Sequence, residues 1–311
     1  MPKISTKRLP ADAGGVADAA RALREGRLVA FPTETVYGLG GDACDGTAVA
    51  GIYEAKGRPS FNPLIVHVAD REMAARYGIF SDQMAALAAA FWPGPLTLVV
   101  PLAPDHGLST LVTAGLDTVA LRVPANALAQ DLLRAFGGPV AAPSANPSGR
   151  ISPTTADHVL AGLDGRIAAV LDGGPCSVGL ESTILGGVPM ALLRPGGLAT
   201  EEIEAVTGPL ATAGSDITAP GQLASHYAPR AALRLNANHA HPGEQMLGFG
   251  PMQSDLNLSV TGDLVEAAAH LFDHLHRLDA KGQPIAVAPI PNCGLGRAIN
   301  DRLRRAAAPR D

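Results

Sequence analysis

The sequence predicts an α/β fold with a mixed sheet, followed by a second and smaller α/β unit. Short apolar runs typical of buried strands alternate with helical patterns through the first two thirds of the 311 residues. Several of these runs follow one another with no helix between them, so we expect some neighbouring strands to be antiparallel. After a stretch rich in Gly, Ala, Pro, Ser and Thr, the alternation resumes over a shorter length.

The first unit begins with a predicted helix over 15–25 and a buried strand over 28–31. This strand ends at Pro32, because proline has no N–H for a sheet ladder. Further strands are predicted over 64–68, 96–101, 119–123, 140–142, 168–171, 182–185 and 190–194. Further helices are predicted over 46–56, 82–91, 126–136, 154–163 and 201–206.

The pattern fails over 208–230, and the composition there predicts a linker between two domains, 1–207 and 231–311. In the second domain the sequence predicts strands over 231–235, 246–249 and 285–290, a helix over 263–278 and a final helix from Gly294. The arginines of the final helix are most simply a solvated face and a cationic C-terminal end.

The composition narrows the class of protein. Hydrophobic residues make up 47% and charged residues 17% of the chain, as in well-packed globular proteins. The net charge of −5 gives no general attraction to nucleic acid or anionic lipid, so a polyanionic ligand needs a local basic cluster. The cysteines, Cys44, Cys176 and Cys293, form no CxxC pair and predict free thiols. With no signal-peptide core and no apolar run near the roughly 18–20 residues of a membrane span, we expect a cytoplasmic protein without a membrane partner.

Familiar motifs for nucleotide, metal or nucleophile chemistry are missing or weak. No GxxxxGKS/T segment is present, which excludes a P-loop. Residues 38–43 match GxGxxA but follow a polar loop, and no acidic residue stands at the expected distance, so we interpret them as a turn. His270, His274 and His276 share one predicted helix without the further ligands of a zinc site. No GxSxG or Cys–His spacing predicts a nucleophile.

Cationic and hydroxyl side chains instead gather at strand ends and in the loops that follow. Lys56 and Arg58 precede a proline-bounded loop, and Arg122 and Arg194 each lie at the end of a predicted strand. Similar positions are occupied by Asn62, Ser144, Asn146, Ser152 and Ser182. Taken singly, each such residue is more often a capping or turn residue. Their repeated placement predicts converging donors for a phosphate or carboxylate ligand.

These residues lie in motifs that point to a family. The segments are FPTETVYGLG over 31–40, KGRPSFNPL over 56–64, AAPSAN over 141–146 and LLRPG over 192–196. In this order they resemble the YrdC-type domain of threonylcarbamoyl-AMP synthases, over nearly all of 10–206. The resemblance implies a YrdC-like twisted mixed sheet with flanking helices and, as in the long synthases, a smaller Rossmann-like α/β C-terminal domain. PGQLASHYAP, over 220–229, resembles the loop that joins those two domains.

The resemblance also implies a role for each matched residue. Threonine contacts are expected from Thr35, His67, Arg122, Ala142 and Ser182, with Arg122 on the carboxylate. ATP contacts are expected from Lys56, Arg58, Asn62, Thr118, Ser144, Asn146, Ser152, Arg194 and Tyr227. Lys56 and Arg58 are the expected catalytic residues, because they would neutralise the triphosphate. No metal ligand is identifiable, and Mg²⁺ is expected to arrive with ATP, held mostly by phosphate and water.

The activity that the resemblance implies is nucleotidyl transfer: L-threonine, bicarbonate or CO2, and ATP give threonylcarbamoyl-AMP and pyrophosphate. This product would serve the tRNA threonylcarbamoyl-transferase machinery, and the protein itself would contact tRNA weakly at most. A non-catalytic RNA-binding or ribosome-maturation module of the same type is an alternative, which the net charge of −5 disfavours. Carbamoyl-phosphate-using relatives in hydrogenase maturation carry zinc-finger and acylphosphatase regions that this sequence lacks.

Overall fold

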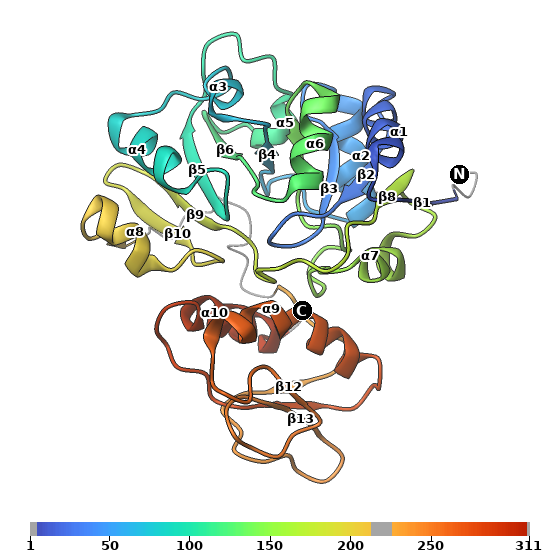
Figure 1. The fold of residues 1–311 in the computed structure, drawn as a ribbon, viewed down its shortest axis with the longest axis vertical. Coiled ribbons are helices and arrows are strands. Elements are labelled where there is room, and N and C mark those ends of the chain that lie inside the picture. Colours follow the sequence, from blue (N-terminus) through green and yellow to red (C-terminus); the bar gives the residue numbers. More distant parts are fainter. Residues whose placement is uncertain (1–4, 213–225, 310–311) are drawn as a thin grey trace.

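The computed structural model describes residues 5–212 and 226–309, and these form two sheets with their helices (Figure 1). The larger sheet lies in the first part of the chain. The smaller sheet lies near the C-terminus, and helices α9 (Leu264–Asp279) and α10 (Gly296–Ala307) stand between it and the first part. Of the predicted linker over 208–230, residues 213–225 lie outside the described part.

The larger sheet contains 11 strands among the described residues, in the order β1-β8-β2-β3-β7-β4-β6-β5-β9-β10-β11. The strands are β1 (Lys7–Leu9), β2 (Val29–Phe31), β3 (Gly38–Asp42), β4 (Ile65–His67), β5 (Leu96–Pro101), β6 (Thr118–Arg122), β7 (Val140–Ala141), β8 (Ala169–Leu171), β9 (Thr183–Gly186), β10 (Ala191–Arg194) and β11 (Ala211–Thr212). The sheet contains parallel pairs such as β4–β6 and antiparallel pairs such as β5–β6, which confirms the predicted mixed sheet.

The helices of the first part are α1 (Ala13–Arg24), α2 (Gly46–Lys56), α3 (Arg71–Ala74), α4 (Asp82–Phe91), α5 (Thr110–Thr113), α6 (Ala127–Phe136), α7 (Ala156–Leu163) and α8 (Thr200–Thr207). Six of them lie close to their predicted ranges, whereas the four-residue helices α3 and α5 were not predicted. Helix α2 shows why its limits were readable. The Asp45 side chain accepts from Thr47 N at the start, and Gly57 takes a left-handed conformation, with φ 59°, at the end. That end delivers Lys56 and Arg58 to the loop that follows.

The interpretation of 38–43 as a turn is wrong, because Gly38–Asp42 forms strand β3 between β2 and β7. Its glycines make room for neighbouring side chains. A Cβ on Gly40 would lie 2.9 Å from Phe31 Cε1 and 3.0 Å from Val140 Cγ1. Glycine in a strand thus marks a close approach rather than a chain reversal.

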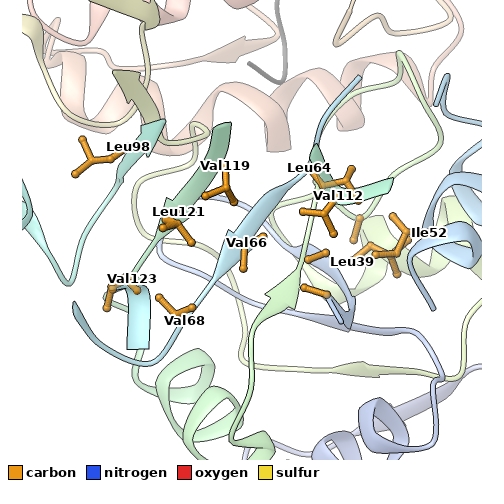
Figure 2. Packing of buried hydrophobic residues seen from close by; sticks show 14 of the residues in the cluster. Leu39, Ile52, Leu64, Val66, Val68, Leu98, Val112, Val119, Leu121 and Val123 are labelled. Atoms are coloured by element: carbon orange, nitrogen blue, oxygen red, sulfur yellow. The ribbon is translucent and has the colours of Figure 1, made fainter. Parts of the chain in front are cut away.

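One apolar cluster fills one side of the sheet around β4 and β6. In Figure 2, Val66 of β4 lies with Val119 and Leu121 of β6, and Leu39 and Ile52 belong to the same cluster. The register pairs Val66 with Leu121 and His67 with Arg122. Because successive strand residues point to opposite faces, His67 and Arg122 lie side by side on the face away from this cluster. The core therefore fixes two of the predicted site residues.

The smaller sheet is parallel, in the order β12-β15-β13-β14 among the described residues. Its strands are β12 (Leu233–Arg234), β13 (Gln245–Gly248), β14 (Leu256–Asn257) and β15 (Ile285–Val287). The apolar cluster around α9 and α10 also contains Val36, Ile151, Leu180 and Tyr227, so it continues into the first part of the chain. Across the described residues, no helix is long and apolar enough to cross a membrane.

Candidate active site

A small cavity lies where strand ends and loops of the first part meet residues 226 and 227. Its volume is about 50 Å³, which is room for a few water molecules. The predicted residues among its lining are Thr35, Arg58, His67, Arg122, Ala142, Ser144, Ser182, Arg194 and Tyr227. The structure therefore brings all five predicted threonine contacts and four of the nine predicted ATP contacts to one cavity.

The PTET loop is held by its own hydroxyl groups and by Arg122. Thr33 Oγ1 accepts from the backbone N–H groups of Thr35, at 3.1 Å, and Val36, at 3.2 Å, which closes a tight turn. The buried Arg122 donates to Thr35 Oγ1 at 2.9 Å and to Glu34 Oε1 at 2.7 Å. Glu34, which sequence reasoning missed as a site residue, therefore shares the guanidinium that was predicted to grip a carboxylate. Its position between two threonines of a polar loop was the available signal.

His67 is a buried, neutral side chain in the same wall. Burial, assisted by the charge of Arg122, lowers its pKa to about 3. Its Nδ1 has no hydrogen-bond partner among the described residues. The ring is packed edge-on against Phe31, with 6.1 Å between ring centroids. This wall therefore offers a fixed, uncharged imidazole rather than a cation.

Ser182 and Arg194 hold the start of β9 against the end of β10. The Arg194 side chain donates from Nη2 to Ser182 O at 2.8 Å and to Ser182 Oγ at 3.2 Å. Ser182 Oγ also lies 2.7 Å from Thr97 Oγ1. Burial lowers the pKa of Arg194, and it stays a cation at neutral pH because arginine starts from so high a value.

Lys56 lies behind the cavity wall instead of in its described lining. Its Nζ donates to Ser144 O and Asn146 O, each at 2.5 Å, so it holds the AAPSAN turn in place. Burial, with the charge of Arg58, puts its pKa well below the ordinary value. Arg58 does line the cavity and donates to Pro63 O at 3.0 Å; burial lowers its pKa to about 10.

Four other predicted nucleotide contacts are also placed outside the described lining of this cavity. Asn62 and Asn146 are buried beside it, and each has an Oδ1 without a partner among the described residues. Ser152 lies behind the wall and donates to Glu181 Oε1. Thr118 is farther away: it begins β6, whose other end carries Arg122, and lines a separate cavity with Phe80 and Met190. A five-residue strand spans about 13 Å between its first and last Cα atoms, so the structure does not bring Thr118 to the site.

Three residues at the cavity were not predicted, namely Glu181 of the first part of the chain and His226 and Arg302 of the C-terminal side, whereas Tyr227 was predicted. Glu181 and His226 line it, and Arg302 of α10 donates to Glu181 Oε2 at 2.7 Å. Tyr227 is 1% exposed and has φ 63°, a left-handed conformation that is uncommon outside glycine. Sequence gave no signal for Glu181 and Arg302, because they are 121 residues apart.

Unpartnered polar atoms gather at this site. Among the described residues, buried side-chain atoms without a hydrogen-bond partner include those of Asn62, His67, Asn146, His226, Tyr227 and Arg302. Buried polar groups are normally paired, so such a gathering marks a place built for a ligand. The cations Arg58, Arg122 and Arg194 make an anionic ligand the best fit.

The site does not fit a metal ion held by the protein. Nowhere in 5–212 and 226–309 do three His, Cys, Asp or Glu side chains lie close enough together to hold one. Glu181, which lines the cavity, and Glu34, which contacts the lining residue Arg122, are each paired with an arginine at 2.7 Å. The expected Mg²⁺ therefore has no ligand set in this part of the chain.

Comparisons with known proteins identify the family of the chain. A profile of the Sua5/YciO/YrdC group, described as "Telomere recombination", matches residues 21–196, and one described as "Threonylcarbamoyl-AMP synthase, C-terminal domain" matches 198–308. The threonylcarbamoyl-AMP synthases of Bacillus subtilis and Pyrococcus abyssi are 44% and 42% identical to this chain, over 95% and 94% of its length and 93% and 94% of theirs.

Solved structures extend the likeness to three dimensions. The structure of P. abyssi Sua5 complexed with L-threonine has a TM-score of 0.89 and 38% identity, and the match covers 98% of this chain and 97% of that one. E. coli YciO, at 20% identity and a TM-score of 0.56, shares the fold over 62% of this chain. The strand-end cavity, both profiles and near full-length relatives lead to one conclusion: the chain belongs to the threonylcarbamoyl-AMP synthase family, and it carries the family's C-terminal domain.

Proposed function

We propose that the chain is an L-threonylcarbamoyladenylate synthase, a nucleotidyltransferase that makes threonylcarbamoyl-AMP and pyrophosphate from L-threonine, bicarbonate or CO2, and ATP. The observation that carries this proposal is the cavity itself, where Arg58, Arg122 and Arg194 converge among neutral polar groups. Such a site suits a ligand with a carboxylate at one end and phosphates at the other. The P. abyssi relative that was solved with L-threonine supports the amino-acid half of the proposal.

Threonine would occupy the end of the cavity formed by the PTET loop and β6. Arg122 would bind the carboxylate with a guanidinium N–H while Glu34 keeps the side chain in place. The hydroxyls of Thr35 and Ser182 would contact the polar groups of threonine, and Ala142 would pack beside it. His67, neutral at physiological pH, offers a hydrogen bond without adding charge.

ATP would lie toward Arg58, Arg194 and Ser144, and the turn at Ser144 would be held by Lys56 from behind. A cavity of about 50 Å³ is smaller than a nucleotide, so part of its wall would have to open when ATP enters. In this arrangement Arg58 would neutralise phosphate directly. Lys56 would act indirectly, because it holds the turn that carries Ser144. Lys56 is thereby proposed as a positioning residue, and Arg58 as the catalytic one.

The reaction needs a nucleophile and charge neutralisation more than a strong base. The threonine nitrogen attacks CO2 and loses a proton, a carbamate oxygen attacks the α-phosphorus, and the α–β bridging bond breaks to release pyrophosphate. His67 and His226 have pKa values lowered to about 3, mainly by burial, so they are poor bases. Catalysis would therefore rest on positioning and on the arginine charges. Mg²⁺ would enter bound to ATP, and no step above is assigned to it.

The product would pass to the tRNA threonylcarbamoyl-transferase machinery, and a cytoplasmic location with at most weak tRNA contact is part of the proposal. The test is pyrophosphate release from ATP by the full-length chain, with each substrate omitted in turn. We expect release that requires both L-threonine and bicarbonate, with D-threonine as the matched control substrate. Equal release without either substrate, or none with all three present, rules the synthase assignment out.

A further inference from the structure

The wall of the cavity that carries Glu181 and Ser182 is seated on the C-terminal domain. Two residues before Glu181, Gly179 has φ 73°, and a Cβ on it would lie 2.4 Å from Ala268 O of helix α9. The next residue, Leu180, is fully buried in the apolar cluster that surrounds α9 and α10. The backbone that leads into the site is therefore packed directly against these helices.

Arg302 of α10 makes the polar part of this contact. The side chain is completely buried, and it donates from Nε to Glu181 Oε2 at 2.7 Å and from Nη1 to Asp301 Oδ2 at 2.8 Å. The other oxygen of Glu181 accepts from Ser152 Oγ. Both oxygens of a carboxylate that lines the cavity are thus fixed from behind, one of them by the C-terminal domain.

The same guanidinium supports Tyr227. Its Cζ lies 5.0 Å from the centroid of the Tyr227 ring, and Phe272 of α9 stacks on that ring at 5.8 Å between centroids. Tyr227 and Glu181 both line the cavity. One buried cation from the C-terminal domain therefore contacts two residues of the cavity wall.

We propose that Arg302 is a positioning residue for the synthase reaction: by holding Glu181 and Tyr227, it makes the C-terminal domain a fixed part of the active site. This inference rests on the proposed function, and it assigns the domain a role in the wall itself. Glu181 would need its charge to keep Arg194 and, through it, Ser182 in place. Loss of Arg302 would leave that charge buried with one fewer partner.

The charge of Glu181 gives the proposal a readout beyond stability. Burial alone would raise the pKa of Glu181, but the charges of Arg302 and Arg194 outweigh it and hold the pKa below the ordinary value. The titratable and charged groups that interact with Glu181 are Arg194 on β10, Arg302 on α10, and His226 and Tyr227, and Asp301 of α10 lies next to these as a partner of Arg302. Without the charge of Arg302, less positive charge opposes the effect of burial, so the pKa of Glu181 rises. Its carboxyl group then gains a proton at a higher pH.

The experiment compares Arg302→Met with Arg297→Met in the full-length chain. Arg297 lies on the same helix and also pairs across the interface, with Glu201 at 3.1 Å, but it is 44% exposed and does not line the cavity. We expect Arg302→Met to lower kcat/KM for threonine by about 10²-fold, the loss that a displacement of about 1 Å causes, and Arg297→Met to change it little. We also expect the acid limb of the pH–rate profile to move to higher pH in Arg302→Met only.

Two further variants keep the test decisive. Glu181→Gln in the Arg302→Met background removes the unpaired charge, and the shifted acid limb should disappear. If Arg302→Met does not fold, Arg302→Lys serves instead, because lysine keeps the charge but cannot hold Glu181 and Asp301 with one planar fork. Unchanged kinetics and an unmoved acid limb in the folded Arg302 variant overturn the proposal. A wild-type protein without threonine-dependent turnover instead overturns the proposed function, so the two failures are distinguishable.

Discussion

Arg122→Met tests the threonine subsite most sharply, because it removes a charge on which the PTET loop depends. Arg122 is 3% exposed and its partner Glu34 is 7% exposed, with 2.7 Å between Nη2 and Oε1. Removing one partner of a buried ion pair costs about 3–5 kcal/mol, because the remaining charge stays buried. For a domain of comparable size this lowers the Tm by about 6 to 20 °C.

The assay separates stability from binding by adding Glu34→Gln to Arg122→Met. The double variant has no unpaired carboxylate, so we expect most of the lost Tm to return while the KM for threonine stays high. Arg122→Lys keeps the charge but loses the fork, and we expect it to raise the KM for threonine about tenfold to hundredfold, the equivalent of about 1.5–3 kcal/mol.

Arg8→Met is the matched control, because Arg8 contacts two aspartates at 2.8 and 2.6 Å but is half exposed. Its ion pairs stay in water, so its loss should leave both the Tm and the KM nearly unchanged. An Arg122→Lys protein with wild-type threonine dependence would refute the reasoning.

Three further predictions follow from the same geometry. Arg58→Met should reduce ATP turnover by the equivalent of about 2–4 kcal/mol with little change in Tm, whereas Lys56→Met should lower both the ATP turnover and the Tm. Equal losses of Tm in the two variants would contradict the assignment of Arg58 as catalytic and Lys56 as positioning. Tyr227→Phe removes a buried hydroxyl without a partner among the described residues, so the Tm should not fall, and any defect should appear as a lower adenylate yield per ATP. Burial lowers the pKa values of His67 and His226 to about 3, far below the roughly 6.5 of an unfolded chain, so only the unfolded state gains these protons between those values. The stabilisation from these neutral histidines is therefore complete above about pH 6.5, and the free energy of unfolding falls as the pH drops, by up to about 1.4 kcal/mol per pH unit for each histidine. Urea unfolding at pH 7, 6 and 5 should show a smaller decline in this free energy for His67→Gln than for the wild type. An identical decline in the two proteins counts against the neutral imidazole.

The sequence was informative wherever one local rule dominated. Helices α2 and α4 begin and end as predicted, because their caps are local: Asp45 and Ser81 accept backbone N–H groups at the start. The strands β4 and β6 were readable from β-branched runs, and their alternation placed His67 and Arg122 on one face. The motif resemblance then supplied the rest of the predicted cavity lining.

Local rules failed where distant segments meet. Strand β3 was interpreted as a turn because of its glycines. Gly40 is required there because the side chains of Phe31 and Val140, on neighbouring strands, leave no room for a Cβ. Glu181 and Arg302 form a pair that no spacing rule connects. Lys56 was expected to face phosphate, yet its ammonium is bound to two backbone carbonyls, a position that depends on how the turn at 144–146 folds over the end of α2.

The apolar cluster around α9 and α10 contains residues from both parts of the chain. Val36 and Tyr227 belong to it and also line the cavity, while Leu271 and Ile299 belong to the C-terminal helices. Unfolding the small sheet and its helices alone would expose the apolar side chains of the first part that pack on them. Heat should therefore melt the chain in one cooperative transition instead of two, and a ligand bound in the cavity should raise the melting temperature of the C-terminal helices as much as that of the sheet that holds it.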